Sequence, residues 1–315
     1  MTSRLHIVPV GISLLNRLEG KPKGSGGRGI GHPVLRGVLG NRDVWRELRA
    51  GPGEVVDVPD SVLGADHAAA RLALEALEPK VCAEWYALDR YAEQFPEAGQ
   101  DTWVFVGSDT EEGSRAAVLT ALGHSYRQEG VPVRYVDDPH TADGFPLQPG
   151  GCHVVRIPGL DLSSREGLPE ETWLGLGGLG GLVVRYARQL EQPSSTPLLN
   201  IVFHLSGGYK AMLPYYLTMA EAVRTTVLKK QLVLVEAFCL YEQSTNLVAL
   251  PVAHFTGELL ERIEKLARAS RGGEVDIDPR TVNGLVGLYL YEELRGGRRG
   301  LTPAGKIIAR TLWET

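Results

Sequence analysis

The chain has 315 residues, 43% of them hydrophobic and 23% charged, a composition typical of a globular protein with one or two domains. Its net charge of −5 argues against a protein that coats nucleic acid nonspecifically, but leaves room for a local basic pocket. Three scattered cysteines without CxxC spacing, and no apolar run of the roughly 18 residues that span a membrane, argue against a disulfide framework, a zinc site and a membrane protein. We expect a cytoplasmic protein that needs no metal or other cofactor.

The first predicted element is a strand from Leu5 to Val10, and a turn of small residues follows it. Open α/β sheets bind ligands at the carboxyl ends of their strands, so this turn is a candidate ligand site. Its candidate residues are Gly11, Ile12, Ser13 and Asn16. Ser13 could instead only cap the next helix. Residues 20–33 are rich in glycine and basic side chains, and either a lid over phosphates or an inert insertion fits that composition.

A second candidate turn follows the next predicted strand. Apolar periodicity predicts helices over 65–78 and 83–94, and Thr102 to Val106 is typical of a strand. The turn behind that strand contains Ser108, Asp109 and Thr110. Asp109 or Thr110 is expected to cap a helix that continues to about residue 128, and contact with a ligand is the second interpretation.

A run of glycines lies further along the chain. Strands are expected over 131–136 and 153–157. The run from Gly175 to Gly181 has the composition of a phosphate-binding loop, but no convincing strand precedes it. We expect it to lead into a helix over 182–191, where glycine would allow close packing.

The stretch from Leu198 to Met219 carries the strongest local pattern. An apolar strand to Leu205 is followed by a glycine pair and then by a long apolar run with the length of a helix. The joint between them consists of Ser206, Gly207, Gly208, Tyr209 and Lys210. Glycine amides at a helix start, together with a lysine, are suited to bind an anion such as phosphate. The spacing is not that of a Walker loop, and a plain tight turn with an exposed lysine is the alternative.

The remaining elements suggest two domains. Strands over 231–239 and 247–250 form a predicted hairpin, and the alternation of strands and helices before it predicts a mostly parallel, Rossmann-like α/β sheet over residues 1–251. For residues 252–315 we expect helices over 255–269 and 279–294, a basic β-wing near 296–300 and a last helix capped by Thr302. This small helical, winged-helix-like domain could bind nucleic acid, but a solvated face or a dimer-packing role is favoured.

Several spaced motifs together resemble the CARF domains of CRISPR-associated proteins. They are Gly11–Asn16, Ala83–Glu84, Ser108–Gly113, Ser206–Ala211, and Tyr241–Glu242 with Leu250–Pro251. The likeness covers roughly residues 4–251 and is nearest to the stand-alone subgroup that includes ring nucleases of type III CRISPR systems. It implies a homodimer with a pocket for a cyclic oligoadenylate across its two-fold axis.

The resemblance also implies roles for single residues. Ser13 and Lys210 occupy the turns that carry ring-nuclease chemistry, and the other candidate residues of the three turns would bind the ligand. His204 stands where the family usually has asparagine. This histidine could bind the ligand, act as an acid or base near neutral pH, or be a satisfied core residue.

The expected function is cleavage of a cyclic oligoadenylate, most simply cyclic tetra-adenylate, in antiviral defence. The ribose 2′-OH would attack the adjacent phosphorus without a metal, and the linear products would end the type III CRISPR signal. The alternative is a non-catalytic regulator that senses the ring and binds DNA through its C-terminal domain. A nucleotide-dependent oxidoreductase is disfavoured, because the first strand lacks G-x-G-x-x-G.

Overall fold

A computed structural model describes most of the chain. The described residues are 3–20, 32–40, 48, 54–96, 101–128, 130–141, 147–161, 168–190, 199–208, 210–227, 233–240, 246–255, 261, 291–293 and 299–313. The loop 241–245, most of the glycine-rich segment 20–33 and most of the helices expected over 255–269 and 279–294 therefore lie outside the described residues.

Among the described residues, the centre of the fold is an eight-stranded mixed sheet with the order β2-β4-β5-β3-β1-β6-β7-β8. The six inner strands are parallel, and β2 and β8 pair antiparallel at the two edges. The strands are β1 (Ser3–Pro9), β2 (Val55–Asp57), β3 (Asp101–Gly107), β4 (Val133–Val136), β5 (Cys152–Arg156), β6 (Leu199–His204), β7 (Val233–Leu240) and β8 (Leu247–Leu250). The prediction of a mostly parallel α/β sheet is confirmed.

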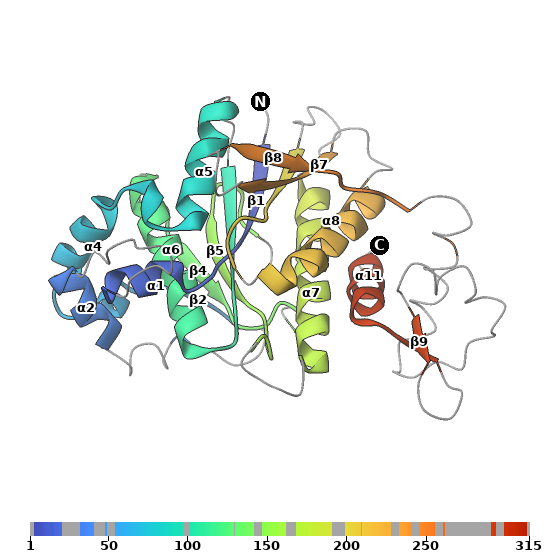
Figure 1. The fold of residues 1–315 in the computed structure, drawn as a ribbon, viewed down its shortest axis with the longest axis horizontal. Coiled ribbons are helices and arrows are strands. Elements are labelled where there is room, and N and C mark those ends of the chain that lie inside the picture. Colours follow the sequence, from blue (N-terminus) through green and yellow to red (C-terminus); the bar gives the residue numbers. More distant parts are fainter. Residues whose placement is uncertain are drawn as a thin grey trace.

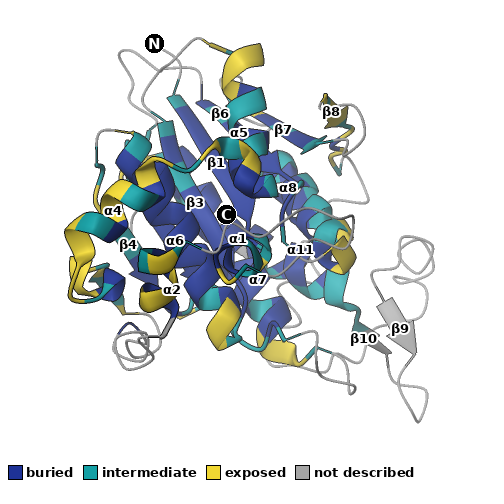
Figure 2. Cartoon of the chain, turned by 60° about the vertical axis from the view of Figure 1, so that its left-hand side comes forward, coloured by how far each residue is buried: buried dark blue, intermediate teal, exposed yellow. Residues whose placement is uncertain are grey.

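Helices cover both faces of the sheet (Figure 1). On one face lie α1 (Ser13–Leu18), α2 (Pro33–Gly40), α4 (His67–Glu75), α5 (Ala83–Gln94) and α6 (Glu111–Arg127). On the other lie α7 (Glu170–Gln189), α8 (Leu213–Val227) and α11 (Pro303–Trp313). Short 3-10 turns are η1 (Asp60–Leu63), η2 (Pro79–Val81) and η3 (Lys210–Met212). Because both faces are covered, the inner strands consist mainly of apolar residues and are buried (Figure 2).

The order of the strands places a reversal at β1. From β1 the chain first builds β2 to β5 on one side, and it then returns through α7 to add β6 to β8 on the other side. In open parallel sheets, ligands bind outside the carboxyl ends of the strands at such a reversal. The turns that follow β3, β1 and β6 lie there.

The glycine run of residues 175–181 lies inside α7, so the prediction that it precedes a helix was wrong. A Cβ atom on Gly177 would lie 2.4 Å from Cβ of Arg310, and one on Gly180 would lie 2.3 Å from Oγ1 of Thr311. Both contacts are with α11, so the glycines allow two helices to approach closely. The low helix propensity of glycine is overridden by this packing.

The C-terminal part agrees with the sequence prediction in some elements only. Tyr291–Glu293 forms a strand, β9, and not the end of the expected helix, because it pairs antiparallel with β10 (Arg299–Leu301). This hairpin lies where a wing was expected. Oγ1 of Thr302 accepts a hydrogen bond from the amide of Gly305 at 3.2 Å, which confirms the predicted helix cap. Ile307 of α11 is buried in the core of the sheet domain, while the domain boundary at residue 251 stays a prediction.

Candidate functional site

The structure brings the three predicted turns together at the carboxyl ends of the central strands, which we call the carboxyl edge of the sheet. They follow β3, β1 and β6, which are direct neighbours. The amide of Val10, directly after β1, donates to the carbonyl of Val106 near the end of β3 at 2.9 Å, so these two strands end side by side. A Cβ atom on Gly11 would lie only 3.3 Å from the amide nitrogen of Gly208, so the turns after β1 and β6 are in contact. Residues that are about 200 positions apart therefore share one site, as is usual for a parallel sheet.

A buried carboxylate holds these two turns against each other. Glu84 lies in the first turn of α5, and 2% of it is exposed. Its Oε1 accepts hydrogen bonds from the amide of Gly11 at 2.8 Å and from the amide of Gly208 at 3.4 Å. Its Oε2 accepts a hydrogen bond from Oγ of Ser13 at 3.1 Å. Glu84 was not among the predicted site residues, although Ala83–Glu84 was one of the motifs that carried the resemblance to CARF domains.

The Gly207–Gly208 pair is required by this arrangement. A Cβ atom on Gly207 would lie 2.5 Å from Oε1 of Glu84 and 2.6 Å from the carbonyl oxygen of Pro9. Gly208 has a φ of 74°, which favours glycine. The amides were expected to face outward toward a phosphate. The amide of Gly208 donates instead to Glu84, so the protein supplies an anion to this turn itself.

The hydroxyl of Ser13 is oriented by the same carboxylate. Ser13 is the first residue of α1 and makes no side-chain cap, so its alternative capping role is not seen. Because its proton points to Glu84, the lone pairs of Oγ remain to accept a hydrogen bond. Ile12, beside it, is 37% exposed. Asn16 lies one turn further along α1 and is half-buried.

The turn after β6 presents its lysine at the surface. Lys210 begins η3 and is exposed, and α8 follows with Pro214 in its first turn, where a missing N–H is tolerated. Ser206 faces the neighbouring strand, because its Oγ accepts a hydrogen bond from the amide of Leu240 at 2.7 Å. Tyr209 lies outside the described residues. Among the described residues of this turn, the groups that remain for chemistry are the cation of Lys210 and the backbone.

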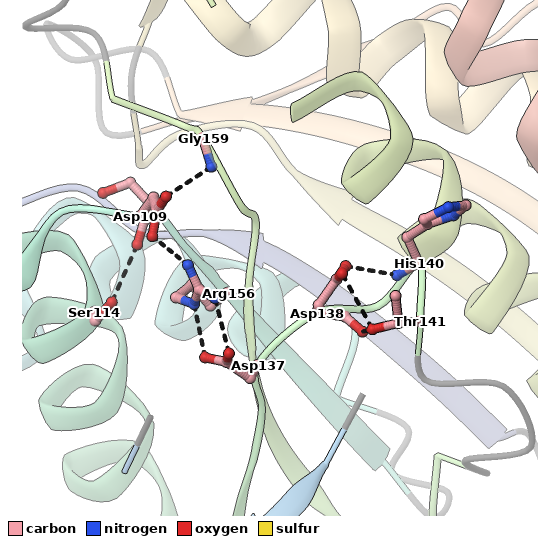
Figure 3. Close-up of polar contacts among 9 residues, drawn as sticks. Asp109, Ser114, Asp137, Asp138, His140, Thr141, Arg156 and Gly159 are labelled. Atoms are coloured by element: carbon pink, nitrogen blue, oxygen red, sulfur yellow. Dashed lines mark hydrogen bonds and ion pairs between the residues drawn. The ribbon is translucent and has the colours of Figure 1, made fainter. Parts of the chain in front are cut away.

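The turn after β3 is held by internal contacts. Thr110 caps α6 by accepting a hydrogen bond from the amide of Gly113 at 3.0 Å, which confirms that prediction, and it lies 3.1 Å from Oγ of Ser108. Asp109 does not cap the helix. One of its oxygens accepts a hydrogen bond from the amide of Gly159 at 2.8 Å, and the other pairs with Arg156 (Figure 3).

Arg156 links Asp109 to a second acid. Its Nε and Nη2 donate to the two oxygens of Asp137 at 2.7 and 2.8 Å (Figure 3). Burial disfavours the charge of Arg156, but the hydrogen bond and charge of Asp137, with the charge of Asp109, raise its pKa above the ordinary value. Such bidentate pairs hold a guanidinium in one orientation. The Asp109 side chain is thus committed to positioning the turn.

His204 is a core residue. It is 1% exposed and lies 2.9 Å, Nε2 to Nδ1, from His6. Burial, with smaller effects of His6 and His124, lowers the pKa of His204 well below its ordinary value, so the ring is neutral. The edge of Tyr91 from α5 packs against it, with the ring centroids 5.1 Å apart. His204 is therefore a core residue, as the third sequence interpretation has it, but its Nδ1 has no hydrogen-bond partner among the described residues.

The fold and the site define an α/β protein with a mostly parallel sheet and three adjoining turns at its carboxyl edge. No known protein-family model matches the chain, and no curated protein matches its sequence. Within the described ranges, no three His, Cys, Asp or Glu side chains are grouped so that they could hold a metal ion. The helices of that part of the chain include none with the length and hydropathy of a membrane span.

Proposed function

We propose that the protein is a CARF-type ring nuclease, which binds a cyclic oligoadenylate at the carboxyl edge of its sheet and cleaves it. The observation that carries the proposal is the contact between the turns after β1 and β6, which places Ser13 and Lys210 on one edge. Cyclic tetra-adenylate is the simplest ligand. Loss of the ring would end type III CRISPR signalling.

The proposed reaction needs no nucleophile from the protein. The ribose 2′-OH attacks the adjacent phosphorus, so that the O2′–P bond forms and the P–O5′ bond breaks. A proton leaves O2′ and another reaches O5′, and the linear product ends in a 2′,3′-cyclic phosphate. The protein has to hold these atoms in line and to stabilise charge on the phosphate.

Two side chains fit these tasks. The hydroxyl of Ser13 donates its hydrogen bond to Glu84, so its Oγ can accept a hydrogen bond from the attacking 2′-OH. Lys210 can stabilise the phosphate, and one such donor is worth about 3–4 kcal/mol of barrier. Because the amide of Gly208 donates to Glu84, this charge stabilisation falls mainly to Lys210.

The proposed working unit is a homodimer. A ring with two-fold symmetry is matched most simply by an isologous interface that presents each turn twice. The partly exposed Ile12 at this edge is suited to such an interface. Light scattering at micromolar concentration, with and without the ring, should give twice the mass of the chain, and a monomer in both conditions would contradict the dimer.

A non-catalytic sensor remains the second candidate. It is favoured by Glu84, which already supplies an anion to the two glycine amides, and by the β9–β10 hairpin, which lies near the predicted basic wing. Such a protein would bind the ring and promoter DNA, and would leave the ring intact.

One assay separates the two candidates. Purified protein in excess over cyclic tetra-adenylate or cyclic hexa-adenylate is sampled over time, in EDTA and with added magnesium or manganese, and the products are resolved by mass. Linear adenylates with a cyclic phosphate, formed at equal rates in EDTA, are expected. Binding without cleavage would favour the sensor. Activity that is lost in EDTA and restored by one of the ions would refute the metal-independent mechanism.

A further inference from the structure

A second concave site lies at the other end of the sheet. A cavity of about 290 Å³ is enclosed by the amino ends of β1 and β3, by α5 and by the last turn of α6. The residues of its lining that matter here are His6, Tyr91, Asp101, Trp103, His124 and Arg127. None of them belongs to the carboxyl edge, so this cavity is separate from the turns described above.

Several buried polar atoms of this lining have no hydrogen-bond partner within the described part of the chain. They are Nε2 of His6, Nε2 of His124, Oδ1 of Asp101 and a terminal nitrogen, Nη2, of Arg127. His124 is only 7% exposed. Buried polar side-chain atoms are nearly always hydrogen-bonded, so four such atoms in one cavity of the described chain point to a ligand-binding site.

The hydrogen-bonding character of each group can be assigned. Nε2 of His6 lies 3.7 Å from Oδ2 of Asp101, which is too long for a hydrogen bond, but the nearby carboxylate favours a proton on Nε2. Nδ1 of His6 then accepts a hydrogen bond from His204. Oδ1 of Asp101 then remains as an acceptor, whereas Arg127 can only donate. Burial, with Arg127 and His6 adding to it, lowers the pKa of His124 to about 3, so that ring is neutral.

Charge and shape restrict the ligand further. The cavity is lined by two arginines and two aspartates, Arg4, Arg127, Asp89 and Asp101, whose charges cancel. An anion would meet Asp101, and a cation would meet Arg127. The ring of Trp103 stacks on that of His6 at a 13° interplanar angle, and Tyr91 presents an edge to the same histidine. These aromatic walls favour a flat ligand.

We propose that this cavity binds an uncharged planar heterocycle that donates a hydrogen bond to Asp101 and accepts one from Arg127, as the edge of a nucleobase does. The volume of about 290 Å³ is at the lower limit of ligand pockets, about 300–1,000 Å³, which suits one ring system and not a whole nucleotide. The base could come as a free nucleobase or as part of a nucleoside. The proposal does not depend on the function proposed for the carboxyl edge.

Calorimetric titration of the full-length protein tests the proposal. The probes are adenine, guanine, cytosine and uracil, each nucleoside, and inorganic phosphate. At least one base should bind with a dissociation constant below a millimolar, and phosphate should not. Tighter binding of the nucleoside would identify it as the source, and tighter binding of the free base would identify the base.

Variants connect the binding to the cavity. Asp101→Asn, which removes the carboxylate but keeps its shape, and His124→Phe should each weaken base binding at least tenfold. The matched control is Glu93→Gln, an exposed acid on α5 whose partner is Arg90, and it should bind within twofold of the wild type. Unchanged affinity in Asp101→Asn would overturn the proposal.

A crystal structure of the wild-type protein with the best-binding base provides a check that does not depend on variant folding. Density for the base between Trp103 and Arg127 supports the site. Ordered water alone in the cavity at a saturating concentration of the base, or no binding of any base, overturns it.

Discussion

Oε1 of Glu84 lies 2.8 Å from the amide nitrogen of Gly11, so a helix residue holds the turn after β1 from 73 positions further along the chain. The same carboxylate reaches Ser13 and Gly208. The relative position of the two turns at the carboxyl edge therefore depends on one buried side chain. Glu84 is a positioning residue for any chemistry at this edge.

The first prediction concerns Glu84→Gln. The new amide group keeps the shape but presents N–H donors to Ser13 or Gly208, which are donors themselves. We expect the free energy of unfolding to fall by about 1.5–3 kcal/mol, the range for hydrogen bonds to a charged group. Urea unfolding measures this. The control Glu93→Gln, on the exposed side of α5, should change it by less than about 0.5 kcal/mol. Equal stability of both variants would contradict a positioning role.

The second prediction concerns Lys210, the exposed cation at the start of η3. If it stabilises the scissile phosphate, Lys210→Ala should slow single-turnover ring cleavage at least tenfold, or about 1.4 kcal/mol of barrier. Stability should not change, because the side chain is exposed. Lys80→Ala, at an exposed lysine of η2, is the matched control and should cleave at the wild-type rate. An unchanged rate for Lys210→Ala would remove this residue from the mechanism.

The third prediction tests the glycines of α7. A Cβ atom on Gly178 would lie 2.6 Å from the backbone of His140, which cannot move away as a side chain can. Gly178→Ala should therefore destabilise the protein by about 1–3 kcal/mol, as overpacking does. Gly37→Ala in α2 has nothing within 4 Å of the new methyl group, and should be neutral or stabilising by up to about 1 kcal/mol. Thermal unfolding of both variants is the measurement. A Gly178→Ala protein as stable as Gly37→Ala would show that α7 is not closely packed there.

The fourth prediction follows from His124. Its pKa is lowered to about 3 in the folded protein, mainly by burial, whereas that of an unfolded histidine is about 6.5. Between these values the unfolded chain binds more protons than the folded protein does. The contribution of His124 to the free energy of unfolding is therefore nearly whole above pH 6.5 and is lost as the pH drops. The loss from this one group is about 2 kcal/mol between pH 7 and pH 5. His204, whose pKa is also lowered by burial, acts in the same direction.

Denaturant unfolding at pH 7 and pH 5 tests whether the free energy of unfolding falls with pH and whether His124 is the group responsible. His124→Phe should lose about 2 kcal/mol less than the wild type over this interval, because it has no proton to bind there. Parallel losses in the two proteins would show that His124 does not carry the effect. The experiment is done without added bases, so that occupation of the cavity does not change with pH.

The sequence alone determined the elements whose signals are local. Val104 to Val106 and Ile201 to Phe203 are buried apolar runs, as is typical of strands that are covered on both faces. Thr110 and Thr302 cap helices through an amide three residues away, so each cap could be read from its neighbours. The three turns could be placed at one edge because parallel strands end together.

Only the tertiary structure decided the features that depend on distant partners. The glycines of α7 are helical because α11, more than a hundred residues further on, packs against them. Asp109 stabilises its turn through Arg156 and not through the helix start. The anion at the glycine turns is Glu84, and the partner of His204 is His6. In each case the stabilising contact joins residues that the sequence separates widely, and local propensity carries no information about which distant side chain will be within hydrogen-bond reach.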